Sequence, residues 1–146
     1  MCPATQQFGE KGARVVQDTD AAFERISPLG DNVFFRHPLD SSIVLSCTNH
    51  RLTGIYLSWD GPFPSNSWFH LAAAAGHAVT GKDLPSLNKA IRDCHRAALK
   101  DKSELSELDV PQAKIECQAF TRDGGGTTVS IWINDNEARR GIEDLE

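Results

Sequence analysis

The sequence predicts a single α+β domain, built from a mainly antiparallel sheet of five or six strands with two principal helices packed on one face. Two observations support this class. Short segments with alternating apolar residues lie on both sides of a helix-rich region, and Gly, Pro, Asn and Asp residues separate them. A chain of 146 residues fits one domain with one core. We therefore expect a domain spanning residues 1–146, with loose polar tails at 1–12 and 135–146.

Alternation predicts the strands. Residues 42–48 and 52–59 each place apolar side chains on one face and are joined by a short polar turn, which predicts an antiparallel hairpin. Residues 115–119 and 129–133 repeat this arrangement around the turn at Gly124–Gly126. Shorter strands are predicted at 33–35 and 13–17.

Helical spacing and capping residues predict the helices. A short helix is expected at 21–26, after Asp18, Thr19 and Asp20. A second is expected at 68–75, and a third begins after Asp83 and carries an apolar stripe through Leu84, Leu87, Ile91, Cys94 and Ala98. Residues 103–111 form an acidic connector, in which one helical turn is an alternative.

The net charge and the cysteine spacing indicate the class of partner and the cellular compartment. The net charge of −5 disfavours broad binding to nucleic acid, which needs clustered Lys and Arg. Cys2, Cys47, Cys94 and Cys117 are widely spaced and form no C-x-x-C pair, so we expect reduced thiols, no disulfide and a cytoplasmic protein. The sequence shows no secretory pattern at its start and no apolar run long enough to span a membrane.

The junction from Trp59 to Phe69 separates the first strands from the helices. Pro62 and Pro64 end the ladder and restrain the loop, which lowers the ordering cost of binding. A protein-binding site is therefore predicted here, together with a tryptophan on the closing hairpin, and its residues are Trp59, Asp60, Phe63, Trp68 and Trp132. The alternative is that these aromatic residues are buried plugs between the sheet and the helices.

No motif specifies a reaction. Cys94 and His95 are neighbours on a helix, so their side chains point about 100° apart and predict no catalytic pair. His70 and His77 lie about 10 Å apart along one helix and cannot clamp one ion. We predict no catalytic residue, no metal site and no cofactor. The alternative is a pocket between sheet and helices, with the acid, base or ligand groups His37, Asp40, His50 and His70.

The function predicted from these features is a noncatalytic protein-binding module, such as a small cytosolic inhibitor, immunity-type protein or chaperone. The partner is a protein, and nucleic acid and membrane are not expected. The alternative is a small-molecule-binding protein or enzyme that uses the pocket. The basic stripe of Lys89, Arg92, Arg96 and Lys100 is typical of a solvated helix face, and Asp93 interrupts it.

Overall fold

The computed structural model describes residues 5–48 and 52–134. In this part of the chain, three α-helices lie against one seven-stranded sheet in which all neighbouring strands are antiparallel. The α+β class is thus confirmed, whereas the predicted five or six strands and two principal helices are too few. None of the helices in the described ranges has the length and apolar composition needed to cross a bilayer.

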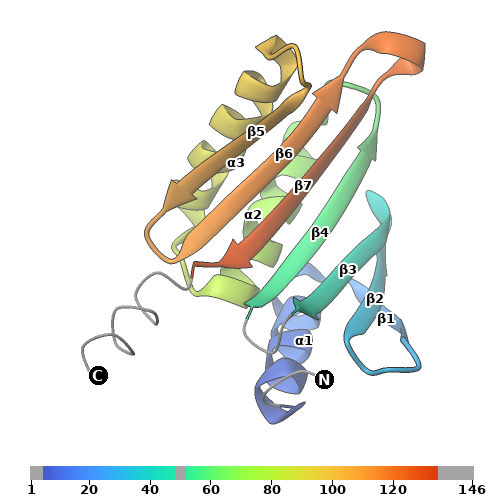
Figure 1. The fold of residues 1–146 in the computed structure, drawn as a ribbon. Coiled ribbons are helices and arrows are strands. Elements are labelled where there is room, and N and C mark those ends of the chain that lie inside the picture. The colour runs from blue at the N-terminus through green and yellow to red at the C-terminus, as the bar shows by residue number, and fades with distance from the viewer. Residues whose placement is uncertain (1–4, 49–51, 135–146) are drawn as a thin grey trace.

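Two hairpin-linked groups of strands meet in the middle of the sheet. The spatial order is β1-β2-β3-β4-β7-β6-β5 (Figure 1). The strands are β1 (Ala22–Ile26), β2 (Asn32–His37), β3 (Asp40–Thr48), β4 (Leu52–Asp60), β5 (Leu105–Val110), β6 (Ala113–Phe120) and β7 (Gly126–Ile133). Both predicted hairpins, β3 with β4 and β6 with β7, are confirmed. The final hairpin strand returns to pair with β4, which joins the two groups.

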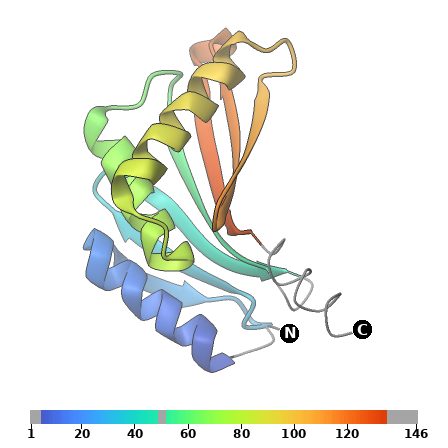
Figure 2. The same ribbon diagram turned by 90° about the vertical axis from the view of Figure 1, so that its left-hand side faces the viewer.

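The helices are α1 (Thr5–Thr19), α2 (Asn66–Thr80) and α3 (Leu84–Lys100), and they cover the same face of the sheet (Figure 2). The side chain of Ser65 caps α2 by accepting from the Trp68 amide, and Asp83 caps α3 by accepting from the Ser86 amide. Gly81 ends α2 with a positive φ of 78°, a conformation that glycine adopts without steric cost. Capping residues therefore set the ends of these helices, and Asp83 stands at the start of α3 as the sequence predicted.

The core lies between the helices and the sheet. One side of each central strand is fully buried, as shown by Leu45, Ile55 and Ile131, while the opposite side of those strands faces away from the helices. Alanines let the second helix approach the sheet closely, and Gly76 leaves room for Ile131, because an added Cβ there would lie 2.9 Å from the Ile131 Cδ1. The first helix packs beside α2, and its Lys11 ammonium donates to the Val79 carbonyl at 2.5 Å.

Two predictions near the N-terminus are wrong. Residues 13–17 were predicted as a strand but lie in α1, and residues 21–26 were predicted as a helix but contain β1. The β-branched pair Val15 and Val16 favours a strand, yet the helix buries only Val15. In the second segment, pairing with β2 determines the structure instead of helical spacing. A helix of about two turns would leave most of its backbone amide and carbonyl groups without an intrahelical hydrogen bond, whereas a strand bonds to its neighbour.

The connector at 103–111 is also different from the prediction. Its alternating residues form the edge strand β5, which pairs with β6 in register from Leu105 to Val110. Of the predicted loose tails, residues 5–12 belong to α1. Residues 1–4 and 135–146 lie outside the described residues, and the single-domain boundaries stay a prediction.

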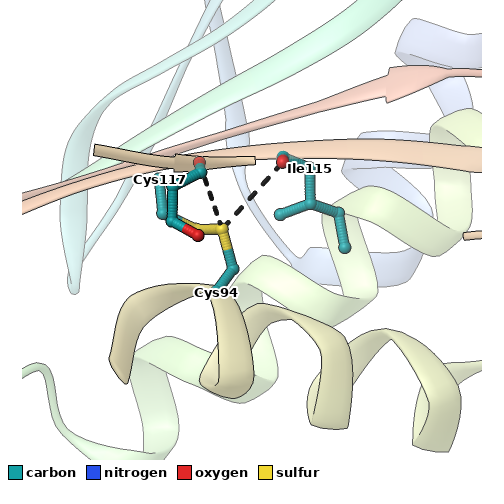
Figure 3. Close-up of a disulfide and its surroundings, with 4 residues drawn as sticks. Cys94, Ile115 and Cys117 are labelled. Carbon is teal, nitrogen blue, oxygen red and sulfur yellow. Dashed lines mark hydrogen bonds between the residues drawn. A yellow bond between two sulfur atoms is a disulfide. The ribbon is translucent and has the colours of Figure 1, made fainter. Parts of the chain in front are cut away.

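A disulfide overturns the prediction of reduced cysteines. Cys94 on α3 is bonded to Cys117 on β6, with 5.9 Å between their Cα atoms (Figure 3). The Cys94 sulfur also lies 3.6 Å from the Ser106 carbonyl oxygen and 3.9 Å from that of Ile115. Cys47 is disulfide-bonded as well, and no described cysteine is free. Both side chains are buried, and they meet across the core between α3 and β6.

Candidate functional site

The loop after β4 is fixed by three contacts at two consecutive residues, Gly61 and Pro62. The Thr127 hydroxyl donates to the Gly61 carbonyl at 2.9 Å, and His95 Nε2 donates to the Pro62 carbonyl at 2.8 Å. The Pro62 ring packs over Gly125, where an added Cβ would lie only 2.5 Å from the Pro62 Cδ. Contacts from β7, from α3 and from the turn that precedes β7 therefore hold this loop in one conformation.

Phe63 follows these fixed points and faces solvent. Its side chain is 70% exposed, whereas Phe69, a few residues further along, is 6% exposed. Asp60, which ends β4 opposite Gly126, is also exposed. The loop thus exposes an apolar side chain, and a carboxylate at its start, at one end of the sheet.

His95 is the buried support beneath the loop. It is 7% exposed, and its ring meets the Phe69 ring edge-on with centroids 5.4 Å apart. Burial lowers the pKa of His95 below its ordinary value of about 6.5, although the hydrogen bond to Pro62 opposes this shift. Around neutral pH the ring is therefore uncharged, with its proton on Nε2, where the Pro62 carbonyl accepts it. Arg92 covers the other part of this aromatic group, 4.5 Å from the centroid of Phe69.

The other predicted binding residues do not share this surface. Trp68 is fully buried, and its indole Nε1 donates to the Ser58 carbonyl at 3.0 Å and to Asp40 Oδ2 at 3.3 Å. Trp59 is half-buried and packs edge-on to Trp68, with ring centroids 6.4 Å apart. The burial alternative therefore describes Trp68, while Asp60 and Phe63 remain accessible.

Trp132 lies on the face of the sheet opposite the helices. It is directly opposite Gly54 in the β4–β7 ladder, and its indole occupies the space that a side chain at Gly54 would need. The missing side chain at Gly54 lets the Trp132 ring pack against β4, so Trp132 is half-buried although none of the described helices covers this face. This position is away from Phe63, because Gly54 lies near the start of β4 and the loop follows its end.

Three of the four alternative pocket residues gather at the turn between β2 and β3. His37 and Asp40 line a depression of about 230 Å³ together with Ser58, Trp59 and others. His37 also lines a neighbouring depression of about 340 Å³, together with Asp18 and His70. The fourth residue, His50, lies outside the described residues. The three described residues therefore line two neighbouring depressions and share no single pocket.

Asp40 is fully occupied as a hydrogen-bond acceptor. Its Oδ1 accepts from the Ser42 amide and hydroxyl at 2.9 and 3.3 Å, and its Oδ2 accepts from the Ser58 amide at 2.7 Å and from Trp68. A carboxylate has about four acceptor sites, so none is left for a substrate proton. Burial and, second, the charge of Asp40 raise the pKa of Tyr56. Asp40 thus joins β3, β4 and α2 as a structural group.

No set of three or more His, Cys, Asp or Glu side chains in the described ranges is arranged to hold a metal ion. The basic stripe on α3 is engaged locally, because Asp93 pairs with both Lys89 and Arg96. We therefore take the loop of residues 60–64, which His95, Thr127 and Gly125 hold in place, as the candidate site.

Sequence reasoning missed the two residues that fix the loop. His95 and Thr127 are separated from their partners by 33 and 66 positions, and nothing in local spacing links them. No family model, no curated protein and no solved structure matches this chain. Function is therefore argued from the geometry alone.

Proposed function

We propose that the chain is a noncatalytic protein-binding module, and that it contacts a protein partner through the loop formed by residues 60–64. The observation that supports this is a 70% exposed Phe63 on a loop held by His95, Thr127 and Gly125. Ordering a surface loop on binding costs free energy, and a loop that is already fixed avoids that cost. Inhibitors, immunity-type proteins and chaperones are the classes that this proposal covers.

The surface around Phe63 suggests the chemistry of the partner. Large apolar side chains that fill a pocket supply most of the binding energy in protein interfaces, and polar groups at the rim set orientation. Here the apolar group is Phe63, and Asp60 supplies an acidic rim on a chain of net charge −5. The complementary partner is a protein with an apolar pocket bordered by Lys or Arg.

Small-molecule binding at the corner of the β2–β3 turn is a second candidate. It is supported by His37 and His70, which line one depression with Asp18. The Leu39 amide donates to His37 Nδ1 at 3.0 Å, so the neutral ring carries its proton on Nε2. Purification from the native cell separates the two candidates, because a stoichiometric protein and a retained small molecule support different functions.

A photo-crosslinking amino acid at position 63 tests the proposed surface, with the same amino acid at position 84 as the matched control. Leu84 is also exposed, at 45%, but begins α3 far along the helix from His95. We expect one discrete crosslinked protein from position 63 only. Phe63→Ala should then weaken binding of that protein by at least about tenfold, as for interface anchors generally, while Leu84→Ala leaves it unchanged.

Equal crosslinking at both positions would contradict the proposal. So would wild-type affinity of Phe63→Ala for the identified partner, with the circular dichroism of both variants native.

The compartment is a separate part of the proposal. The expected cytoplasmic location depended on reduced cysteines, whereas Cys94 and Cys117 are bonded. Structural disulfides form and persist mainly in oxidising compartments. We propose such a compartment for this protein. Intact-mass measurement under non-reducing conditions, on protein from its native cell, tests this because a disulfide lacks the hydrogens of two thiols.

A further inference from the structure

Arg92 on α3 is held in place by uncharged groups. Its Nε donates to Asn88 Oδ1 at 2.7 Å, and its Nη1 donates to Asn66 Oδ1 at 3.1 Å. The carbon of the guanidinium lies 4.5 Å from the centre of the Phe69 ring. These contacts order the side chain before any partner binds, so binding does not have to supply the free energy of ordering it.

The positive charge of Arg92 has no counter-ion among the described residues. The carboxylate next to it in sequence, Asp93, pairs with Lys89 and Arg96 instead. Only Nε and Nη1 of Arg92 donate within the part of the chain that the structure describes, so the hydrogens of Nη2 are left for another acceptor. Arg92 is also half-buried, and a charge-assisted hydrogen bond is stronger there than in open solvent.

Arg92 lies at the α2 end of the loop that carries Phe63. The loop joins β4 to α2, and α3 runs beside α2 (Figures 1 and 2). Asn66, which accepts from Arg92, is the first residue of α2 and follows Phe63 closely in sequence. His95, one turn along the same face of α3, donates to the carbonyl of Pro62. The guanidinium is thus connected to the loop both before and after Phe63.

We propose that Arg92 binds an Asp or Glu side chain of the protein partner, at the border of the pocket that receives Phe63. This inference rests on the proposed function of the loop. The planar guanidinium suits a carboxylate, because its N–H groups can donate to both oxygens of that group. The partner that fits this surface therefore carries an acidic residue near Arg92.

Asp60 and Arg92 together determine how the partner is oriented. Asp60 is exposed at the β4 end of the loop, and Arg92 lies at the other end, so opposite charges flank the apolar Phe63. A partner with Lys or Arg on one side of its pocket and Asp or Glu on the other matches both charges. The reversed orientation places like charges opposite each other, which costs binding free energy and excludes that arrangement.

The test measures affinity for the protein that is captured by the crosslinking amino acid at position 63. Arg92→Met removes the charge but keeps an unbranched apolar side chain over Phe69, and it should raise the dissociation constant by at least about tenfold. Arg96→Met is the matched control, because it removes the same charge one turn further along α3 from an exposed residue that pairs with Asp93. The control should change the dissociation constant by less than about threefold.

A double-mutant cycle separates ion pairing from a structural role of Arg92. Each surface Asp and Glu of the captured protein is replaced by Asn or Gln. One of these changes should weaken binding to the wild-type chain by at least about tenfold, and binding to Arg92→Met by less than about threefold. A loss of affinity that came only from a less ordered loop would show no such dependence on one carboxylate of the partner.

Three results overturn this inference: wild-type affinity of Arg92→Met, an equal loss in Arg96→Met, or the absence of a coupled Asp or Glu in the partner. The proposed function survives all three if Phe63→Ala still weakens binding. If Phe63→Ala binds as tightly as the wild-type chain, or if position 63 captures no discrete protein, the proposed function fails and this inference fails with it.

Discussion

The contact between Gly54 and Trp132 allows a prediction worked from atomic distances. In Gly54→Ala, the new Cβ would lie 2.3 Å from the Cδ2 and Cε3 atoms of the Trp132 ring. Carbon atoms in contact normally sit about 3.5 to 4.0 Å apart, so the indole must move away by more than about 1 Å. Because Trp132 lies on the face opposite the three described helices, we expect the ring to move outward and lose its packing on β4.

The expected magnitude follows from two opposing effects. Overpacking of this kind typically costs about 1 to 3 kcal/mol, whereas replacing glycine by alanine inside a strand typically gains about 0.5 to 1 kcal/mol. We therefore expect Gly54→Ala to lower the free energy of unfolding by about 1 kcal/mol. In a Trp132→Ala background the clash is absent, and Gly54→Ala should raise the free energy of unfolding by about 0.5 kcal/mol.

Urea unfolding of the four proteins in this double-mutant cycle provides the measurement. The reasoning requires that the effect of Gly54→Ala change sign, or at least fall to zero, when Trp132 is absent. An equal loss of stability in both backgrounds would refute it, since the cost would then come from the β4 backbone and not from the indole.

Two further predictions concern the helix layer. In the chain-entropy model, a disulfide that closes a loop of 23 residues stabilises a protein by about 3 kcal/mol. The double variant Cys94→Ala, Cys117→Ala should therefore have a free energy of unfolding about 3 kcal/mol lower than that of the wild-type protein. A loss below about 1 kcal/mol would contradict this prediction. Burial lowers the pKa of His95 in the folded protein, so as the pH falls below about 6.5 the unfolded chain binds a proton at this residue before the folded protein does. The stability that neutral His95 contributes is therefore complete above about pH 6.5 and is lost as the pH falls below that value. Denaturant titrations should show a weaker pH dependence in this window for His95→Gln than for the exposed control His70→Gln, and identical profiles would count against burial as the cause.

The central strands and the helices α2 and α3 could be predicted from sequence because each carries a complete local pattern. Asp83 and Pro85 mark the start of α3, and the alternation through Leu45 and Cys47 marks β3. These signals are local, and burial on one side enforces them. The α+β class followed from the order of those elements.

The peripheral elements failed because their patterns are incomplete. β1 is exposed along its whole length, so its residues carry no alternation and their helical spacing is misleading. β5 alternates, but its outward residues Glu107 and Asp109 made it resemble a polar connector. In both strands the hydrogen bonds to a neighbouring strand determine the structure, and that neighbour cannot be identified from the segment itself.

The candidate site was predictable only in part. Proline spacing indicated a restrained loop with Phe63 in it, and the structure places that side chain at the surface. Trp68 could not be distinguished from Phe63 by sequence, because both are aromatic residues of the same junction. The burial of Trp68 on α2 depends on Asp40 of β3 and Ser58 of β4, which accept hydrogen bonds from its indole.

The Cys94–Cys117 bond limits how far one border of the sheet can open. The covalent loop that it closes contains all of β5, so local opening at that border cannot separate the strand far from α3 and β6. Reduction of this bond removes the restraint, and amide hydrogen exchange along β5 should then become faster.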